Sequence, residues 1–127
     1  MDGTNALNWF EISVSDITRA KKFYETIFSI EPMEAQEMMG MKMAYLPADM
    51  MGGKVGGGLV ESPMHKPSAD GAKIYLNANP DMDAVLAKVS TSGGTVTMPK
   101  TKISDEIGYM AFFLDTEGNS VGLHSNK

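Results

Sequence analysis

An internal duplication constrains the fold of this chain more than any other feature. Four residues, Asp16, Ile17, Ala20 and Tyr24, recur 65 positions later as Asp81, Met82, Val85 and Val89. A shift of 64 places Gly58 and Leu59 on Gly122 and Leu123. In each copy an aspartate suited to an N-cap precedes a helical stripe of apolar residues. Such a repeat predicts two copies of one supersecondary unit that bury their apolar faces together.

The first copy has the pattern of a β-α-β-β-β unit. Residues 7–15 alternate, with Phe10, Ile12 and Val14 on one face and Trp9, Glu11 and Ser13 on the other, which is strand periodicity. A helical stripe then predicts a helix over residues 17–28. Three strand-like runs follow at about 33–38, 41–46 and 55–61, separated by Gly40 and by a turn at 51–53.

The second copy repeats this order after a segment rich in Pro, Ser, Asp and Gly. Residues 62–71 carry no apolar period and are typical of a linker. A strand is then predicted at 73–78, a helix between Asp81 and the Gly93-Gly94 pair, and strands at about 95–98, 109–115 and 121–124. We therefore predict one α+β domain over 1–127, with module one at about 6–62 and module two at about 72–127.

Composition narrows the class of protein. A chain of 127 residues with 43% hydrophobic residues can bury one continuous core. The net charge is −5 and the basic residues form no dense run, so nucleic-acid binding is not expected. No cysteine is present for a disulfide or a thiolate metal site, and no apolar stretch suits a signal peptide or a membrane span. We expect a soluble, cytoplasmic protein without a membrane partner.

Two strings resemble a known superfamily. Residues 9–16 (WFEISVSD) with 19–28 (RAKKFYETIF) look like the first strand and helix of a vicinal oxygen chelate module, the superfamily of glyoxalase I, bleomycin-resistance proteins and extradiol dioxygenases. Residues 115–125 (DTEGNSVGLHS) are similar to its closing hairpin. The resemblance implies two tandem βαβββ modules that form a curled mixed sheet, a partial barrel around a cavity with the helices outside. It also implies a homodimer, because members commonly pair two chains.

The resemblance further indicates where a divalent metal would be held. In metal-dependent members, His or Glu side chains project into the cavity from the first and fourth strands of each module. Here the two positions of the family pattern fall on Trp9 and Gly122. The duplication adds Gly58 and either Ile74, favoured by the helix register, or Tyr75, favoured by the strand alternation. None of these is a strong ligand, so we expect no metal and no other cofactor.

Two residues are candidates for proton transfer. Glu11 should share the cavity face with Trp9, where an apolar pocket would favour a general base, although it could instead pair with Lys100 or Lys102 or be solvated. His124 should share the cavity face with Gly122, as a structural histidine or as a general acid or base. The other histidine, His65, lies in the linker and is expected to be exposed.

Apolar and aromatic side chains are the candidates for ligand binding. Trp9, Tyr75 and Tyr109 would offer flat walls with polar tips, and Asn77 should face the cavity with Tyr75. Met43 belongs to a group of six methionines within residues 38–51 that either lines an adaptable pocket or fills the core. The glycines at 52–58 precede no helix and lack a Gly-Lys-Ser/Thr ending, so a phosphate-binding loop is not indicated.

Two functions are compatible with these features. The first is a glyoxalase/bleomycin-resistance-like protein that binds a small organic, partly aromatic ligand in the cavity without the usual divalent metal. The alternative is a glyoxalase- or dioxygenase-type enzyme, a lyase, isomerase or oxygenase, that uses Glu11 or His124 with an unconventional metal or with none. The fold hosts both, so the choice depends on the site.

Overall fold

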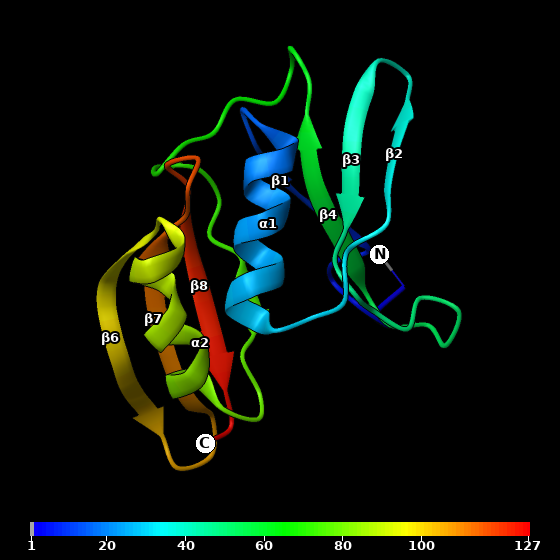
Figure 1. Ribbon diagram of the computed structural model, residues 1–127. Helices are drawn as coiled ribbons and strands as arrows, with labels where there is room; N and C mark the ends of the chain where they lie inside the picture. Colours follow the sequence, from blue (N-terminus) through cyan, green and yellow to red (C-terminus); the bar gives the residue numbers. More distant parts are fainter. Residues whose placement is uncertain (1) are drawn as a thin grey trace.

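The computed structural model describes residues 2–127 as two β-α-β-β-β modules (Figure 1). Module one contains β1 (Trp9–Ser13), α1 (Ile17–Phe28), β2 (Ala35–Met38), β3 (Met41–Tyr45) and β4 (Gly56–Glu61). Module two contains β5 (Tyr75–Asn77), α2 (Met82–Val89), the 3-10 turn η1 (Ser90–Ser92), β6 (Thr95–Ser104), β7 (Gly108–Leu114) and β8 (Ser120–Ser125). The predicted α+β fold with tandem modules is confirmed.

Both helices begin where the repeat predicts. The carboxylate of Asp16 accepts a hydrogen bond from the backbone N–H of Arg19 at 3.1 Å, and Asp81 does the same for Ala84 at 3.1 Å. Each cap satisfies one of the N–H groups that the first helical turn leaves without a partner. The duplicated aspartates therefore fix the start of each helix.

One strand is longer than its sequence pattern predicts. The prediction ended near residue 98, yet β6 runs from Thr95 to Ser104 and includes Pro99. β6 is the edge strand of its sheet, and its pairing with β7 shifts register between Met98 and Thr101, around the proline. An edge strand with a bulge tolerates proline because no ladder hydrogen bond is required there.

The two sheets have the same topology, which is the structural form of the duplication. Their strand orders are β1-β4-β3-β2 and β5-β8-β7-β6, and in each the first strand pairs in parallel with the last. Ile12 pairs with Leu59 as Leu76 pairs with Leu123, and Glu11 pairs with Gly58 as Tyr75 pairs with Gly122. Strand pairing thus makes Tyr75 the counterpart of Glu11.

The core lies on the helix side of both sheets. Figure 1 shows α1 between the two sheets and α2 beside β7 and β8. α1 contacts α2 as well as β3 and β4, and the buried residues form one cluster that includes Phe23, Tyr24, Val89 and Phe113. Within residues 2–127 the sheets stay separate and do not close into a barrel. No helix in this part of the chain is long and apolar enough to cross a membrane.

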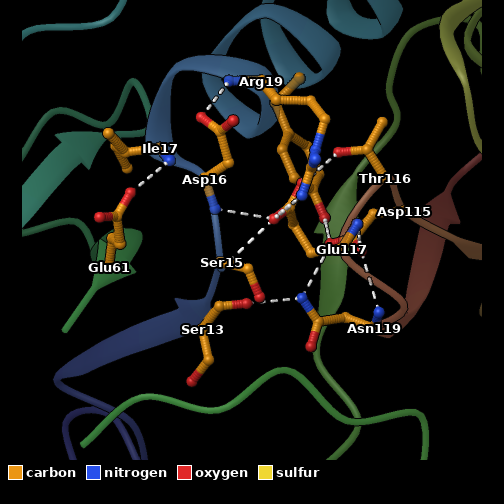
Figure 2. Close-up of polar contacts among 11 residues, drawn as sticks. Ser13, Ser15, Asp16, Ile17, Arg19, Glu61, Asp115, Thr116, Glu117 and Asn119 are labelled. Carbon is orange, nitrogen blue, oxygen red and sulfur yellow. Dashed lines mark hydrogen bonds and ion pairs between the residues drawn. The ribbon is translucent and has the colours of Figure 1, made fainter. Parts of the chain in front are cut away.

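A buried carboxylate joins the closing hairpin of module two to the start of α1 (Figure 2). The side chain of Glu117 is fully buried and accepts hydrogen bonds from the backbone N–H groups of Ser15 and Asp16, both at 2.9 Å. Arg19 donates from Nε at 2.7 Å and from Nη2 at 2.8 Å, and the Thr116 hydroxyl donates at 2.8 Å. Burial alone would raise the pKa of Glu117, but these donors outweigh it and lower that pKa to about 2.

A second buried carboxylate, that of Asp115, holds the same hairpin by hydrogen bonds. Asp115 accepts hydrogen bonds from the hydroxyl of the fully buried Tyr24 at 2.7 Å and from the backbone N–H groups of Glu117 and Asn119. Asn119 in turn donates to the carbonyl of Ser13 at 2.7 Å and accepts from the N–H of Ser68 at 2.9 Å. The Asp-x-x-Gly-Asn turn therefore connects β1, α1 and the linker, and it fixes the two modules against each other.

Candidate functional site

A cavity of about 1030 Å³ lies where the two modules meet. Its wall is formed by β1, the start of β4, the segment between β3 and β4, the C-terminal end of α1, and β5 with its flanking residues. Four residues predicted for the cavity face line it: Trp9, Glu11, Tyr75 and Asn77. Phe10, Phe28 and Ile74 add apolar surface from the core side. The cavity is large enough for a drug-sized organic molecule.

The strand alternation that predicted these positions is visible in the burial. Ile12 and Val14 are buried in the core, whereas Glu11 is exposed and Trp9 and Ser13 are half-buried. In β5, Leu76 is buried while Tyr75 and Asn77 are exposed. Trp9 and Glu11 in β1, and Tyr75 and Asn77 in β5, thus lie on the face of their sheet that the helices leave uncovered.

Each of the two aromatic residues in the cavity wall, Trp9 and Tyr75, contacts a second aromatic ring on its own sheet. Trp9 makes an edge contact with Tyr45, with ring centroids 5.8 Å apart, and Tyr75 makes the same type of contact with Phe112 at 5.3 Å. The ring of Tyr75 lies over Gly122, where a Cβ atom would be only 2.7 Å from Cδ1 of Tyr75. A glycine at 122 is therefore required for Tyr75 to lie flat against β8.

A chain of hydrogen bonds ends on the carboxylate of Glu11. Nε2 of His65 lies 2.8 Å from Oε1 of Glu11, and Nδ1 of His65 lies 2.7 Å from Oγ of Ser62. Because the carboxylate of Glu11 can only accept, Nε2 of His65 carries the proton, and Nδ1 of the neutral imidazole then accepts the hydroxyl hydrogen of Ser62. The indole N–H of Trp9 donates to the other oxygen of Glu11 at 3.3 Å.

His65 was expected to be an exposed linker residue, and this expectation is corrected. Its side chain is only 17% exposed, because the linker folds back into an isolated bridge between Ser62 and His65 that lies against β1. The local signal was the Ser62-x-x-His65 spacing around Pro63, which suits a tight turn. The contact with Glu11 spans 54 residues and carries no sequence signal of its own. Lys100 and Lys102 do not reach Glu11; they pair with Asp83 and Asp105.

The positions that correspond to metal ligands do not suit a divalent cation. Strand pairing places Tyr75 opposite Gly122, whereas Ile74 lines the cavity from the core side. It also matches Trp9 with Lys73, because module two has one residue more than module one between the strand and the helix cap. None of Trp9, Gly58, Lys73, Tyr75 and Gly122 is an imidazole or a carboxylate. Among residues 2–127 no group of three or more His, Cys, Asp or Glu is arranged to hold a metal ion.

The remaining candidates lie away from the cavity wall. Nε2 of His124 donates to the carbonyl of Ile107 at 2.7 Å, so its ring is held by the β6–β7 turn. Tyr109 packs at the core edge, with the ammonium of Lys100 over its ring at 4.6 Å from the centroid. Met43 is buried on β3 beside Val60. None of these three is among the residues that line the cavity.

Comparison with known proteins agrees with this fold. The model of the Glyoxalase/Bleomycin resistance protein/Dioxygenase superfamily matches residues 6–123. A protein of Mycobacterium bovis named "Putative glyoxylase CFP32" is 34% identical over 119 residues, which cover 91% of this chain but 44% of the relative. The chain thus spans less than half the length of that relative, and the protein of the same name from Mycobacterium tuberculosis matches equally.

Solved structures share the fold at lower identity. A glyoxalase/bleomycin resistance protein from Albidiferax ferrireducens superimposes with a TM-score of 0.66 at 20% identity, covering 97% of this chain and 100% of the other. TnmS3, an antibiotic binding protein from a Streptomyces species, has a TM-score of 0.64 at 22% identity and covers 98% of both chains. Because the family model matches nearly the whole sequence, this chain belongs to the glyoxalase/bleomycin resistance protein/dioxygenase superfamily.

Proposed function

We propose that this chain binds a small organic, partly aromatic molecule in the cavity between its modules, without the divalent metal that many members of the superfamily use. The observation that carries the proposal is the cavity of about 1030 Å³ with Trp9 and Tyr75 in its wall and no imidazole or carboxylate at the corresponding ligand positions. A concave, largely apolar surface with a few polar groups is the usual form of a small-molecule site. The similar fold of an antibiotic binding protein supports the same class of function.

The direct experiment is a ligand screen read by two signals. Thermal shifts would be measured across libraries of small aromatic compounds and thiol adducts, because a ligand that binds only the folded state raises the melting temperature. Trp9 is the single tryptophan of the chain and lies in the cavity wall, so its fluorescence reports binding at that site. Ligands that raise the melting temperature and alter Trp9 emission support the proposal, whereas ligands that bind without changing Trp9 place the site elsewhere.

The metal content gives a separate prediction. We expect the purified protein to contain substoichiometric zinc, nickel and iron, and we expect chelators to leave its melting temperature unchanged. The reason is that Trp9, Gly58, Lys73, Tyr75 and Gly122 supply no strong ligand. Elemental analysis by mass spectrometry tests this, and a tightly bound stoichiometric ion whose removal lowers the melting temperature would overturn the metal-free proposal.

A second candidate function is an enzyme that uses Glu11 as a general base. The specific observation in its favour is the hydrogen-bond chain from Ser62 through His65 to Glu11, which orients a carboxylate in the cavity wall. Turnover of a thiol adduct of a 2-oxoaldehyde, lost in Glu11→Gln and reduced in His65→Ala, would favour this reading. Absence of turnover with retained binding would favour the binding protein.

The assembly is predicted from the superfamily and from the exposed edges of the sheets. β2 and β6 are edge strands, and all four residues of β2 are exposed. Such edges are commonly covered by a second chain. We expect a homodimer in solution, measured by light scattering coupled to size-exclusion chromatography. A mass of one chain that does not change with concentration would contradict this prediction.

A further inference from the structure

The charge of the cavity is opposite to that of the whole chain. The protein carries a formal net charge of −5, yet the charged side chains that line the cavity are two lysines, Lys54 and Lys73, and one carboxylate, Glu11. Lys54 comes from the segment between β3 and β4, and Lys73 precedes β5, so the two modules contribute one cation each. The wall therefore has an excess of positive charge although acidic residues predominate in the chain.

The two lysines are available to a ligand, whereas the carboxylate is already engaged. Among residues 2–127 neither Lys54 nor Lys73 forms an ion pair, and Lys73 donates one hydrogen bond, to the carbonyl of Ala69 at 2.6 Å. Glu11 accepts hydrogen bonds from His65 and Trp9. Both lysines are exposed and line the cavity. They can bind an anion without first breaking an ion pair.

Asn77 is a third donor that lines the same cavity. Its side-chain oxygen accepts from both the backbone N–H and the side-chain N–H of Asn79, at 2.9 and 2.8 Å. These bonds fix the amide orientation and leave the Asn77 Nδ2 group as a donor. Lys54, Lys73 and Asn77 thus offer the cavity two ammonium groups and an amide N–H, which are donors suited to an oxyanion rather than to a cation.

We propose that the ligand of this cavity carries a carboxylate or a sulfonate next to an aromatic body, with the ring against Trp9 and Tyr75 and the anion toward Lys54 and Lys73. The inference rests on the proposed function, because it names the chemical class of the ligand at that same site. Because both lysines are exposed, salt screens their attraction for the anion, so the preference for an anionic ligand is expected to be largest at low ionic strength.

The test compares two probes of the same shape that differ in charge, 2-naphthoate and its neutral amide, 2-naphthamide. Calorimetric titration is expected to give at least roughly tenfold tighter binding for the naphthoate at low salt, with an advantage that shrinks as ionic strength rises. In a Lys54→Gln/Lys73→Gln variant the advantage should fall by roughly tenfold while naphthamide binding stays within about twofold. The matched control is Lys22→Gln/Lys127→Gln, which removes the same charge from exposed positions outside the cavity.

Different results would overturn the anionic ligand class and the proposed binding function. Equal binding of the two probes, or a naphthoate preference that the control variant loses as fully as the cavity variant, overturns the anionic ligand class and leaves the aromatic binding site in place. If neither probe binds at millimolar concentration, the aromatic ligand class fails and the proposed function fails with it. Circular dichroism of each variant verifies that the lysine substitutions leave the fold intact.

Discussion

Replacing Glu117 by glutamine is expected to lower the free energy of unfolding by about 2 to 4 kcal/mol. The fully buried carboxylate accepts five hydrogen bonds, two of them from Arg19. Glutamine has one acceptor oxygen, so its NH₂ group would face donors and Arg19 would lose its charged partner. Chemical denaturation measures the loss, and an unchanged midpoint and slope would show that the network adds nothing to stability.

The same carboxylate predicts how stability depends on pH. Its pKa is lowered from 4.5 to about 2 in the folded state, so the unfolded chain takes up the proton first as the pH falls. The stabilisation is complete above about pH 4.5 and is lost as the pH falls toward 2, by about 2 to 3 kcal/mol in total. The difference between wild type and Glu117→Gln should therefore shrink over this window. Glu106→Gln, an exposed carboxylate outside the network, is the matched control and should track wild type.

Periodicity and repetition predicted the features of this fold that depend on local sequence. The alternation in residues 9–14 assigned Trp9 and Glu11 to one face and Ile12 and Val14 to the other, and the capping aspartates marked both helices. These patterns work because burial and hydrogen bonding follow the backbone period. They offered Ile74 or Tyr75 as the counterpart of Trp9 and missed Lys73, because one additional residue before the second helix cap shifts the helix register relative to the strand register.

Contacts between distant segments could not be predicted. His65 reaches Glu11 because the linker folds back against β1, and although the Ser62-x-x-His65 spacing suits a turn, no local pattern predicts the contact with a residue 54 positions away. For His124, strand alternation predicted the cavity face, and the strand register places it opposite Asn77. Its ring nevertheless donates to the carbonyl of Ile107 in the β6–β7 turn and does not line the cavity. Alternation predicts which side of a sheet a side chain occupies and not what covers that side. Lys54 and Lys73 line the cavity but were not predicted to do so. Both lie outside the strands, where alternation makes no prediction.

Replacing Trp9 by alanine is expected to weaken binding of an aromatic ligand by about 1 to 3 kcal/mol, through the loss of aromatic contact area in the cavity wall. The residue is half-buried on the sheet face away from the core, so the fold should tolerate the change. Calorimetric titration of 2-naphthamide is the appropriate measurement, because the neutral probe isolates ring contacts from the charge of the two lysines. Tyr75→Ala, on the opposite module, should have an effect in the same range.

The control for this substitution removes apolar area outside the cavity. Ile103 is 41% exposed on the edge strand β6 and does not line the cavity, so Ile103→Ala should leave the affinity unchanged. Trp9→Ala also removes one donor from Glu11, which keeps its bond to His65 at 2.8 Å. Trp9→Phe separates the two effects, since it retains an aromatic ring without the indole N–H and should recover most of the affinity if ring contact dominates. Wild-type affinity in Trp9→Ala would mean that the ligand binds away from β1, and a collapse of the melting temperature would mean that Trp9 supports the fold rather than the site.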